Sequence, residues 1–286
     1  MPELPEVEIT KRSLSKQILL KKVKSVTIIN PKLRYNLTSE RLNDLKNQII
    51  IRIKRRSKYI LIYFNKKHVL LIHLGMTGRF YFINKYKNKI DTSFYSKKNI
   101  LQAHDHLKIT FNKFDLIYND IRKFGFIKKI NLKDINNTTH LFKLGCEPLT
   151  SKFNFIYLKE KIINSRTSIK NLLLNQSVVS GLGNIYVNEV LYLCKINPKR
   201  YGYSIKDYEI KNLVKSIKKI LKNAIKAGGS TISNYHNSEG KIGSYQSNFK
   251  VYGQEGANCH RSRCGGKIKR IFHTGRSIFF CSSCQT

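Results

Sequence analysis

The chain has 286 residues, and its mass of 33.3 kDa is enough for two domains with a buried core. With 41% hydrophobic and 25% charged residues, the composition is that of a globular protein and excludes a disordered or fibrous one. Lys and Arg number 54 against 17 Asp and Glu, and the net charge of +37 favours a polyanionic partner such as nucleic acid. The abundance of Lys, Asn and Ile is also typical of an AT-rich genome, and we attribute roughly half of the excess charge to that bias.

Membrane insertion and secretion are both disfavoured. The longest apolar runs are far shorter than the ~20 residues that cross a bilayer. Glu3, Glu6 and Glu8 lie where a signal peptide would carry positive charge. We therefore expect an intracellular, cytoplasmic protein, in which cysteines clustered near the C-terminus bind metal rather than form disulfides.

The N-terminal half is predicted to be mainly strands after one opening helix. Pro5 suits the first turn of that helix, and a second short helix is predicted over 40–49, after Ser39. Short β-rich runs then follow at 59–64, 69–75, 79–83, 106–111, 115–120 and 124–130. Many short strands in succession indicate a β-sandwich or barrel.

After about residue 150 the periodicity becomes helical. The clearest helix follows Ser204, with Asp207 three residues later as in a capping box, and Gly228 and Gly229 end it. Its apolar face comprises Ile210, Leu213, Val214, Ile217, Ile220, Leu221, Ala224 and Ile225. The stretch 131–150 is the best candidate for a linker.

Four cysteines flank a predicted hairpin at the C-terminus. Cys259 and Cys264 precede it, and Cys281 and Cys284 follow it, with a turn over 273–276. Two such pairs bring four thiolates to one tetrahedral Zn²⁺, which is structural because no ligand position remains for water. A segment this short lacks a core of its own, so metal binding would supply most of its folding free energy. Two disulfides, or a site in which His260 replaces one cysteine, are the alternatives.

The amino terminus offers a possible nucleophile. If Met1 is removed, the chain begins with the secondary amine of Pro2, which is less protonated at neutral pH than a lysine and is competent to form an imine. Glu3 beside it could move protons. Taken alone, however, Pro2 and Glu3 more often mark only the start of a helix.

A series of motifs favours a catalytic role for Pro2 and Glu3 over a simple helix start. In order they are MPELPEVE, RRSKYI (55–60), HLGMTGRF (73–80), the histidine pair of AHDHLKI (103–109), IRKFG (121–125), LGCEPL (144–149), TSIKNLLLNQ (167–176), VSGLGNIYVNEVLY (179–192) and the terminal cysteines. The series resembles the formamidopyrimidine-DNA glycosylase family of bacterial 8-oxoguanine repair enzymes over nearly the whole chain. SEGKIGSYQ (238–246) resembles the loop of that family that covers the extruded purine, and with PELPEVE it favours this family over its endonuclease VIII relatives.

The resemblance implies an α+β fold. We expect an N-terminal β-sandwich with flanking helices over 1–130, followed by the linker over 131–150. A helical domain with a helix–two-turn–helix element and the lesion-recognition loop is then expected over 151–247, and a zinc-ribbon hairpin over 248–286.

The resemblance also implies base-excision repair. The expected activity is removal of 8-oxoguanine and formamidopyrimidines from duplex DNA, followed by strand cleavage through β,δ-elimination, by a monomer with one structural zinc. An endonuclease VIII-like glycosylase for oxidised pyrimidines is one alternative. A zinc-ribbon DNA-binding protein without catalysis is the other.

Matching positions imply the catalytic residues. Pro2 would attack the sugar of the damaged nucleotide, and Glu3 would protonate the opening sugar ring. Lys58 would serve the elimination steps or hold the adjacent phosphate. Arg276 at the hairpin tip would bind phosphates that flank the lesion and assist the second elimination.

Other matching positions imply DNA contacts. His104, Lys170 and Asn184 would contact backbone phosphates, and Arg166 is the nearest candidate for one further basic contact. Met76, Arg122 and Phe124 resemble the residues that fill the gap left by the flipped base.

Two departures from the family pattern stand out. Four residues separate Cys259 from Cys264, where the family usually has two. Ile121 and Lys123 flank Arg122 where the family typically has proline and arginine.

Overall fold

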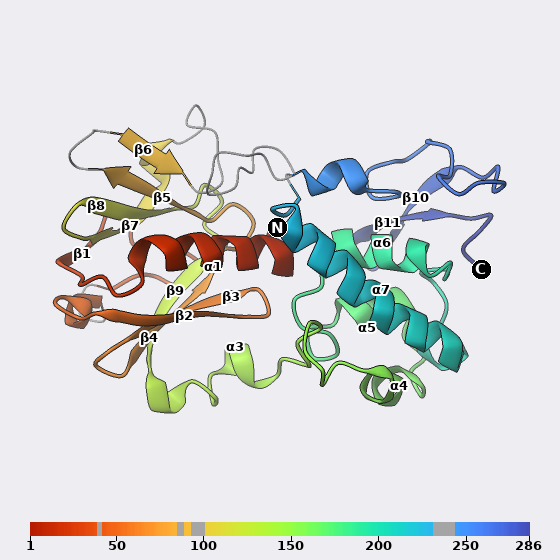
Figure 1. Ribbon diagram of the computed structural model, residues 1–286, viewed down its shortest axis with the longest axis horizontal. Coiled ribbons are helices and arrows are strands. Elements are labelled where there is room, and N and C mark those ends of the chain that lie inside the picture. The colour runs from red at the N-terminus through yellow and green to blue at the C-terminus, as the bar shows by residue number, and fades with distance from the viewer. Residues whose placement is uncertain (39–41, 85–88, 93–100, 231–243) are drawn as a thin grey trace. The chain divides into compact units, whose positions relative to one another are not determined.

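The computed structural model describes residues 1–38, 42–84, 89–92, 101–230 and 244–286. The chain divides into two units, which Figure 1 shows as ribbons. The first unit comprises Met1–Phe142 and Ala227–Ser244, and the second comprises Lys143–Lys226 and Tyr245–Thr286. Each unit is therefore assembled from two separate pieces of chain.

Two antiparallel sheets form the first unit. One has five strands in the order β1-β7-β8-β5-β6, and the other has four in the order β2-β3-β4-β9. The strands are β1 (Ser25–Ile28), β2 (Ile50–Arg56), β3 (Tyr59–Phe64), β4 (His68–His73), β5 (Arg79–Asn84), β6 (Lys89–Thr92), β7 (Asp105–Thr110), β8 (Phe114–Asn119) and β9 (Phe126–Asn131). One large cluster of buried apolar side chains draws members from both sheets, so they pack face to face as the predicted β-sandwich.

Strands β3 and β4 are buried on both faces, which explains their almost unbroken apolar sequence. Because side chains alternate along a strand, Ile60 and Ile62 enter the sandwich core while Leu61 and Tyr63 enter a second cluster. Residues of the following segment, including Leu141 of α3 (Thr139–Phe142), pack against that second cluster.

Helix α1 (Leu4–Ile18) begins with a reciprocal cap. The Glu3 side chain accepts a hydrogen bond from the backbone of Glu6, and the Glu6 side chain accepts one from the backbone of Glu3. Pro5 lies in the first turn as predicted, and Val7 and Leu14 are fully buried in the sandwich core.

Part of the first unit differs from the prediction. β1, β2 and β6 were not predicted. In β2 four basic side chains interrupt the apolar pattern, and Ile51 is itself exposed. Of the predicted helix over 40–49, residues 40 and 41 lie outside the described part of the chain. Leu42 is α-helical and Asn43–Leu45 form the 3₁₀ turn η1, whereas residues 46–49 are not helical. Asn47 prevents continuation, because its φ is 64° and its N–H donates to the carbonyl of Val23.

Helices dominate the second unit. They are α4 (Phe155–Ile162), α5 (Ile169–Leu174), α6 (Asn184–Leu193) and α7 (Asp207–Lys226). Turns over 175–183 separate α5 from α6, and together they form the predicted helix–two-turn–helix element. The Gln176 side chain holds these turns, since it donates to the carbonyls of Leu174 and Leu182 and accepts from the N–H of Gly181.

The start of α7 corrects the predicted cap. Ser204 ends the preceding 3₁₀ turn η5 (Gly202–Ser204), and its hydroxyl donates to the carbonyl of Tyr201 instead of capping α7. The helix begins at Asp207, and the Glu209 carboxylate accepts from the N–H of Lys206 just before it. The acid that caps the helix is thus Glu209, not Asp207.

The C-terminal hairpin has the predicted form. Strands β10 (Ile268–His273) and β11 (Arg276–Cys281) pair through a two-residue turn in which Thr274 and Gly275 both have positive φ. Tyr192 of α6 packs in a small apolar cluster with the hairpin. None of the helices in the described ranges has both the length and the apolar character that a bilayer span requires.

Candidate functional site

Glu6 organises the amino terminus of the first unit. Its side chain is 3% exposed. One carboxylate oxygen accepts from the N–H of Glu3 at 2.9 Å, and the other accepts from the N–H and hydroxyl of Ser230 at 2.8 and 2.9 Å. A Cβ added to Gly229 would lie 3.3 Å from this carboxylate. Glu6 therefore fixes the backbone beside Pro2 against a segment from the far end of the chain.

Charged groups surround the terminal amine. The pKa of the Met1 α-amino group lies below its usual value, chiefly because burial penalises the charged form. Glu3 and Glu6 act in the opposite direction, and the positive charges of Lys58 and Arg122 lower the pKa further. Glu3, Lys58 and Arg122 are thus all near enough to the start of the chain to affect the charge of its amine.

Lys58 lies in the tight turn between β2 and β3. Its side chain is buried, and the preceding Ser57 has a φ of 54°. Arg55 holds this turn, because its guanidinium donates to the carbonyl of Ser57 at 2.9 Å and to the carboxylate of Glu8 at 3.1 Å. The turn is thereby tied to α1, the helix that follows Pro2.

Met76, Arg122 and Phe124 lie on two loops that touch. A Cβ added to Gly75 would lie only 2.4 Å from the nitrogen of Gly125, so the loops approach closely. Met76 and Phe124 are 41% and 49% exposed. The Arg122 guanidinium lies 4.8 Å from the centre of the Phe124 ring, a cation–π geometry.

Asp120 and Thr77 join these loops through hydrogen bonds. The Thr77 hydroxyl donates to one carboxylate oxygen of Asp120 at 2.5 Å and accepts from the N–H of Arg122 at 3.0 Å. The other oxygen of Asp120 accepts from the N–H of Gly125 at 2.8 Å. Lys123, at a φ of 59°, takes the left-handed conformation between them.

The two histidines of the AHDHLKI motif have different environments. His104 ends the 3₁₀ turn η3 (Gln102–His104) with a half-buried side chain. His106 is fully buried, and its two ring nitrogens lie 3.0 Å from the carbonyls of Asn30 and Asp120. His106 is therefore structural, and of these two histidines only His104 keeps part of its side chain exposed.

In the second unit, Lys170 and Asn184 converge on the hairpin. Lys170 is 1% exposed, and its ammonium donates to the carbonyl of Ser277 at 2.7 Å. The side-chain amide of Asn184 donates to the same carbonyl at 3.0 Å. Ser277 directly follows the exposed Arg276, so both side chains hold the strand that carries this arginine. Burial, and then the charge of Arg276, lower the pKa of Lys170 to about 7.

The lowered pKa of Lys170 makes stability depend on pH. The unfolded chain keeps the lysine proton up to a pH of about 10.4, whereas the folded protein releases it near 7, so the free energy of unfolding rises with pH across that interval. We expect a rise of roughly 2 kcal/mol between pH 7 and 9 that is missing in Lys170→Met. Urea unfolding of both proteins at the two pH values measures it. Lys199→Met, at an exposed position in the same unit, should retain the rise, and equal pH profiles for Lys170→Met and the unchanged protein would contradict the assignment.

The four cysteines form one cluster in the second unit. Their sulfur atoms all lie within 4.8 Å of one another, with 3.8 Å between Cys259 and Cys284 and 3.6 Å between Cys264 and Cys281. Four sulfurs at about 2.3 Å from a tetrahedral Zn²⁺ are about 3.8 Å apart, so the residues fit the ion. These distances exclude disulfides, and the cluster does not include His260.

The longer first knuckle makes contacts of its own with α6. Arg261, inside that knuckle, donates to the carbonyls of Tyr192 and Leu193 at the end of α6, and its guanidinium lies 4.7 Å from the centre of the Tyr192 ring. The Tyr192 hydroxyl lies 3.3 Å from the sulfur of Cys259. The two extra residues between Cys259 and Cys264 therefore do not prevent the four cysteine sulfur atoms from lying close together.

Arg166 and the loop over 238–246 were predicted to contact DNA, whereas Glu6 and Asp120 were not predicted as site residues. Arg166 lies in the loop before α5, where it lines a cavity. Of the predicted loop 238–246, residues 238–243 lie outside the described part of the chain. Glu6 and Asp120 were not singled out from the sequence, although the spacing of Glu3 and Glu6 is itself a capping signal.

Comparisons with known proteins agree with this architecture. Residues 1–127 match the formamidopyrimidine-DNA glycosylase N-terminal domain, and residues 144–236 match the helix–two-turn–helix domain of the same glycosylases. The fold and these matches define a DNA glycosylase of the helix–two-turn–helix class, whose members act in base-excision repair. The chain belongs to the formamidopyrimidine-DNA glycosylase family.

Individual relatives match over their full length. The formamidopyrimidine-DNA glycosylase of Rickettsia bellii is 38% identical over 286 residues, covering 100% of this chain and 99% of that protein. The Lactococcus lactis protein bound to DNA with an abasic site is 36% identical, with 99% of each chain covered and a TM-score of 0.85. The same protein bound to oxidised-pyrimidine DNA is 35% identical, with 100% of each chain covered and a TM-score of 0.85.

Proposed function

We propose that this protein excises oxidised purines, such as 8-oxoguanine and formamidopyrimidines, from duplex DNA through the amine of Pro2, and then cleaves the strand at the abasic site. The observation that carries the proposal is the set of charged groups around the terminal amine, with Glu3, Lys58 and Arg122 among them. Because the substrate is chromosomal DNA, we place the protein in the bacterial cytoplasm, on the nucleoid.

The proposed chemistry uses side chains of the first unit. Once Met1 is removed, the Pro2 nitrogen attacks C1′ of the damaged nucleotide, and the bond from C1′ to the base breaks with its electron pair on the base. The departing base takes up the proton that the Pro2 nitrogen releases. Glu3 donates a proton to the ring oxygen as the sugar opens, which leaves an iminium ion on Pro2. Burial lowers the pKa of the Met1 α-amino group, and we expect the same surroundings to favour the neutral form of the Pro2 amine. Lys58 assists the β- and δ-eliminations that release the flanking phosphates.

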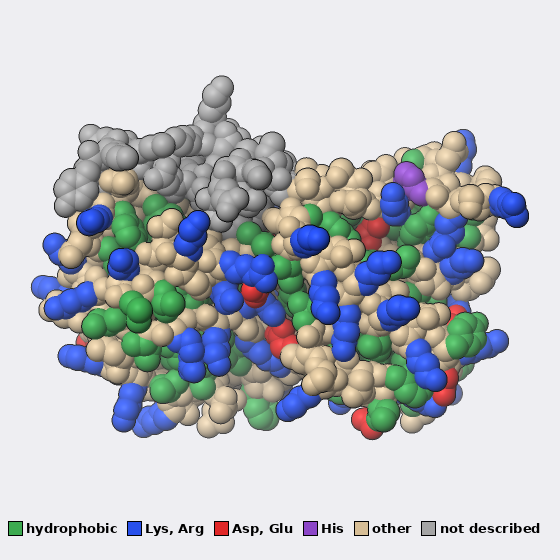
Figure 2. Space-filling view, in the orientation of Figure 1, with side chains coloured by type: hydrophobic (Ala, Val, Ile, Leu, Met, Phe, Trp, Pro, Cys, Tyr) green, Lys and Arg blue, Asp and Glu red, His purple; other side chains and the backbone are tan. Residues whose placement is uncertain are grey.

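Duplex DNA is the proposed partner, and relatives crystallised with lesion-containing DNA support it. Lys and Arg side chains are spread over the face of the molecule shown in Figure 2, which favours a polyanion. We propose phosphate contacts by Arg276, His104 and Arg166. Lys170 and Asn184 are also proposed to contact phosphate. Both side chains already donate to the carbonyl of Ser277, beside Arg276, and would keep this hydrogen bond when they bind a phosphate.

A structural Zn²⁺ is proposed for the C-terminal cluster. Cys259, Cys264, Cys281 and Cys284 would hold it, and the ion would supply folding free energy to the hairpin rather than a catalytic step. In this proposal residues 1–130 contain the catalytic residues, and residues 131–150 are the linker to the next domain. Residues 151–247 bind DNA, and the hairpin of residues 248–286 holds Arg276 in position.

A glycosylase for oxidised pyrimidines is the second candidate, because the Lactococcus lactis protein binds oxidised-pyrimidine DNA. Single-turnover excision from matched duplexes with 8-oxoguanine or an oxidised pyrimidine tests both. Faster release of the purine is expected. Faster release of the pyrimidine would favour the second candidate, and release of neither would leave a DNA-binding protein without catalysis.

Arg122 should decide which base is accepted opposite the lesion. Flipping leaves an orphan base, and the guanidinium offers donors that match the acceptors of cytosine better than those of adenine. Such a match contributes roughly 1–3 kcal/mol of discrimination, so Arg122→Ala should lose the preference for cytosine by about tenfold or more. Single-turnover excision of 8-oxoguanine opposite each base measures the ratio.

The control for Arg122 is cleavage of a pre-formed abasic site, which needs no extrusion of a stacked base. Arg122→Ala should retain this cleavage, and Phe124→Ala should slow excision more than it slows abasic-site cleavage. An unchanged ratio in Arg122→Ala would make the residue a phosphate contact instead.

A further inference from the structure

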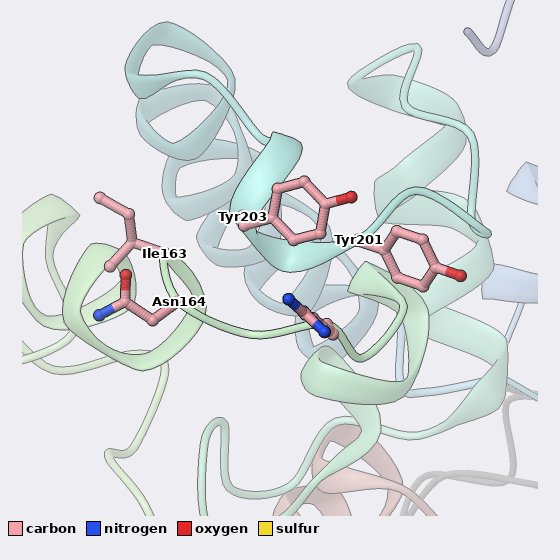
Figure 3. Close-up of a pocket in the computed structure, with 5 residues that line it drawn as sticks. Ile163, Asn164, Tyr201 and Tyr203 are labelled. Carbon is pink, nitrogen blue, oxygen red and sulfur yellow. The ribbon is translucent and has the colours of Figure 1, made fainter.

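A cavity in the second unit is lined by aromatic and basic side chains. It has a volume of about 580 Å³ and is bounded by Ile163, Asn164, Arg166, Tyr201 and Tyr203. Figure 3 shows the Tyr201 and Tyr203 rings at this cavity, carried by the segment between α6 and α7. The volume is in the range of sites that bind small organic ligands.

The two tyrosine rings at this cavity lie nearly parallel to each other. Their centres are 5.6 Å apart and their planes differ by 18°, so the rings are stacked. They are nevertheless 50% and 55% exposed. Stacked rings of a protein core are normally covered by apolar neighbours, whereas these keep much of their surface in contact with solvent. The surface is therefore available to a planar ligand.

The backbone under the rings is firmly held. Segment 165–168 pairs with segment 201–203, since the N–H of Gly202 donates to the carbonyl of Thr167 and the N–H of Tyr203 to the carbonyl of Ser165. A Cβ added to Gly202 would lie 2.4 Å from the carbonyl oxygen of Ile162, so the two segments are in close contact. The backbone that carries the two rings is thus fixed by hydrogen bonds within the second unit.

Arg200 fixes the same turn from the other side. Its guanidinium makes a bidentate pair with the carboxylate of Glu209, at 2.6 and 2.9 Å, and donates to the carbonyl of Ser204 at 2.6 Å. The side chain of Arg200 is therefore fully engaged. Among the described residues no carboxylate lies within ion-pair distance of Arg166, which leaves its charge for a ligand.

We propose that Tyr201, Tyr203 and Arg166 form a binding site for an unpaired nucleotide of single-stranded DNA. A base stacks on the outer face of the tyrosine pair, and Arg166 pairs with the adjoining phosphate. The bases of an intact duplex already stack on each other, so only an unpaired base can use this surface. The proposal rests on DNA binding by this protein and adds a site for a second state of the DNA.

The position of the site in the chain supports this assignment. Segment 165–168 leads directly into α5, where the N–H of Ile169 donates to the carbonyl of Arg200 and Lys170 follows. The pocket thus adjoins the start of the helix–two-turn–helix element, the part of the chain to which we assign phosphate contacts. A strand held there could extend into the pocket once its bases are unpaired.

Binding of a fluorescent oligothymidylate, which contains neither lesion nor duplex, tests the site. Tyr201→Leu/Tyr203→Leu should weaken binding about tenfold, because leucine retains apolar surface but cannot stack on a base. Tyr208→Leu is the matched control, since Tyr208 is 61% exposed on α7 and does not line the pocket. Equal affinity of the double variant and the unchanged protein, or an equal loss in Tyr208→Leu, would overturn the proposal.

The salt dependence separates stacking from charge. Arg166→Gln should reduce the slope of log affinity against log salt concentration by about 0.7, the value for one phosphate contact on a single strand. The tyrosine double variant should keep the slope of the unchanged protein, and a reduced slope there would overturn the stacking assignment. Excision of 8-oxoguanine is measured in parallel. If the unchanged protein does not excise 8-oxoguanine but its oligothymidylate binding depends on the two tyrosines, only the proposed function is refuted. If it excises 8-oxoguanine but its oligothymidylate binding does not depend on the tyrosines, only this site is refuted.

Discussion

Borohydride added during the reaction should link the protein covalently to DNA that contains 8-oxoguanine, and the bond should be to Pro2. The hydride reduces the iminium carbon, which otherwise hydrolyses, so the protein–DNA adduct becomes permanent. An uncleaved tag on the amino terminus converts the nucleophilic amine into an amide and should abolish the adduct. Gel electrophoresis of labelled duplex measures the adduct, and peptide mapping locates it.

Two variants sharpen this test. Pro2→Gly should keep part of the trapping, since a primary amine also forms an imine. Glu3→Gln preserves the shape of the capping side chain but not its proton chemistry, and base excision should fall by about a hundredfold or more. Asp44→Asn, which alters an exposed carboxylate paired with Lys129 in the same unit, is the control. Undiminished trapping by the tagged protein would show that Pro2 is not the nucleophile.

Replacing Cys281 with Ser should abolish DNA binding while the first unit stays folded. The small cluster around Tyr192, Val251 and Phe279 cannot hold the hairpin by itself, whereas a structural zinc contributes on the order of 10 kcal/mol to such a fold. Without the ion, β11 loses its anchor and Arg276 loses its fixed position. Binding to a lesion duplex should therefore weaken by orders of magnitude.

Metal analysis and circular dichroism complete the zinc experiment. The unchanged protein should carry one zinc per chain, Cys281→Ser should carry none, and the β-sheet signal of the first unit should persist. Cys146→Ser changes a cysteine outside the cluster and should retain both zinc and binding. A protein purified without zinc, or a Cys281→Ser variant that binds DNA normally, would contradict the assignment.

Local patterns predicted much of the fold. The strands β3 to β5 and β7 to β9 followed from apolar runs, and the hairpin followed from the turn between two cysteine pairs. β2 was missed because its basic side chains interrupt the apolar pattern. In the described residues the helix predicted over 40–49 ends after Leu45. The residues that follow have helical propensity, but a long-range hydrogen bond from Asn47 to Val23 fixes a different backbone there.

The candidate site was predictable only where it depends on short motifs. PELPEVE placed Pro2 and Glu3 at the start of a helix, and the resemblance to the glycosylase family implied their catalytic roles. The contact of Glu6 with Ser230 joins residues 224 positions apart, and that of Thr77 with Asp120 joins residues 43 apart. No periodicity within a short window encodes such pairs, so the structure was needed to find them.

The discontinuous first unit has a consequence for biosynthesis. A ribosome delivers α1 and both sheets early, but Ser230, which binds Glu6, leaves the exit tunnel only after all of α7 has been made. A nascent chain that stalls or is cut before that point has a folded sandwich without the partner of its Glu6 carboxylate. The amino terminus, although synthesised first, is therefore among the last parts of the protein to be completed, and incomplete translation products lack a finished terminus.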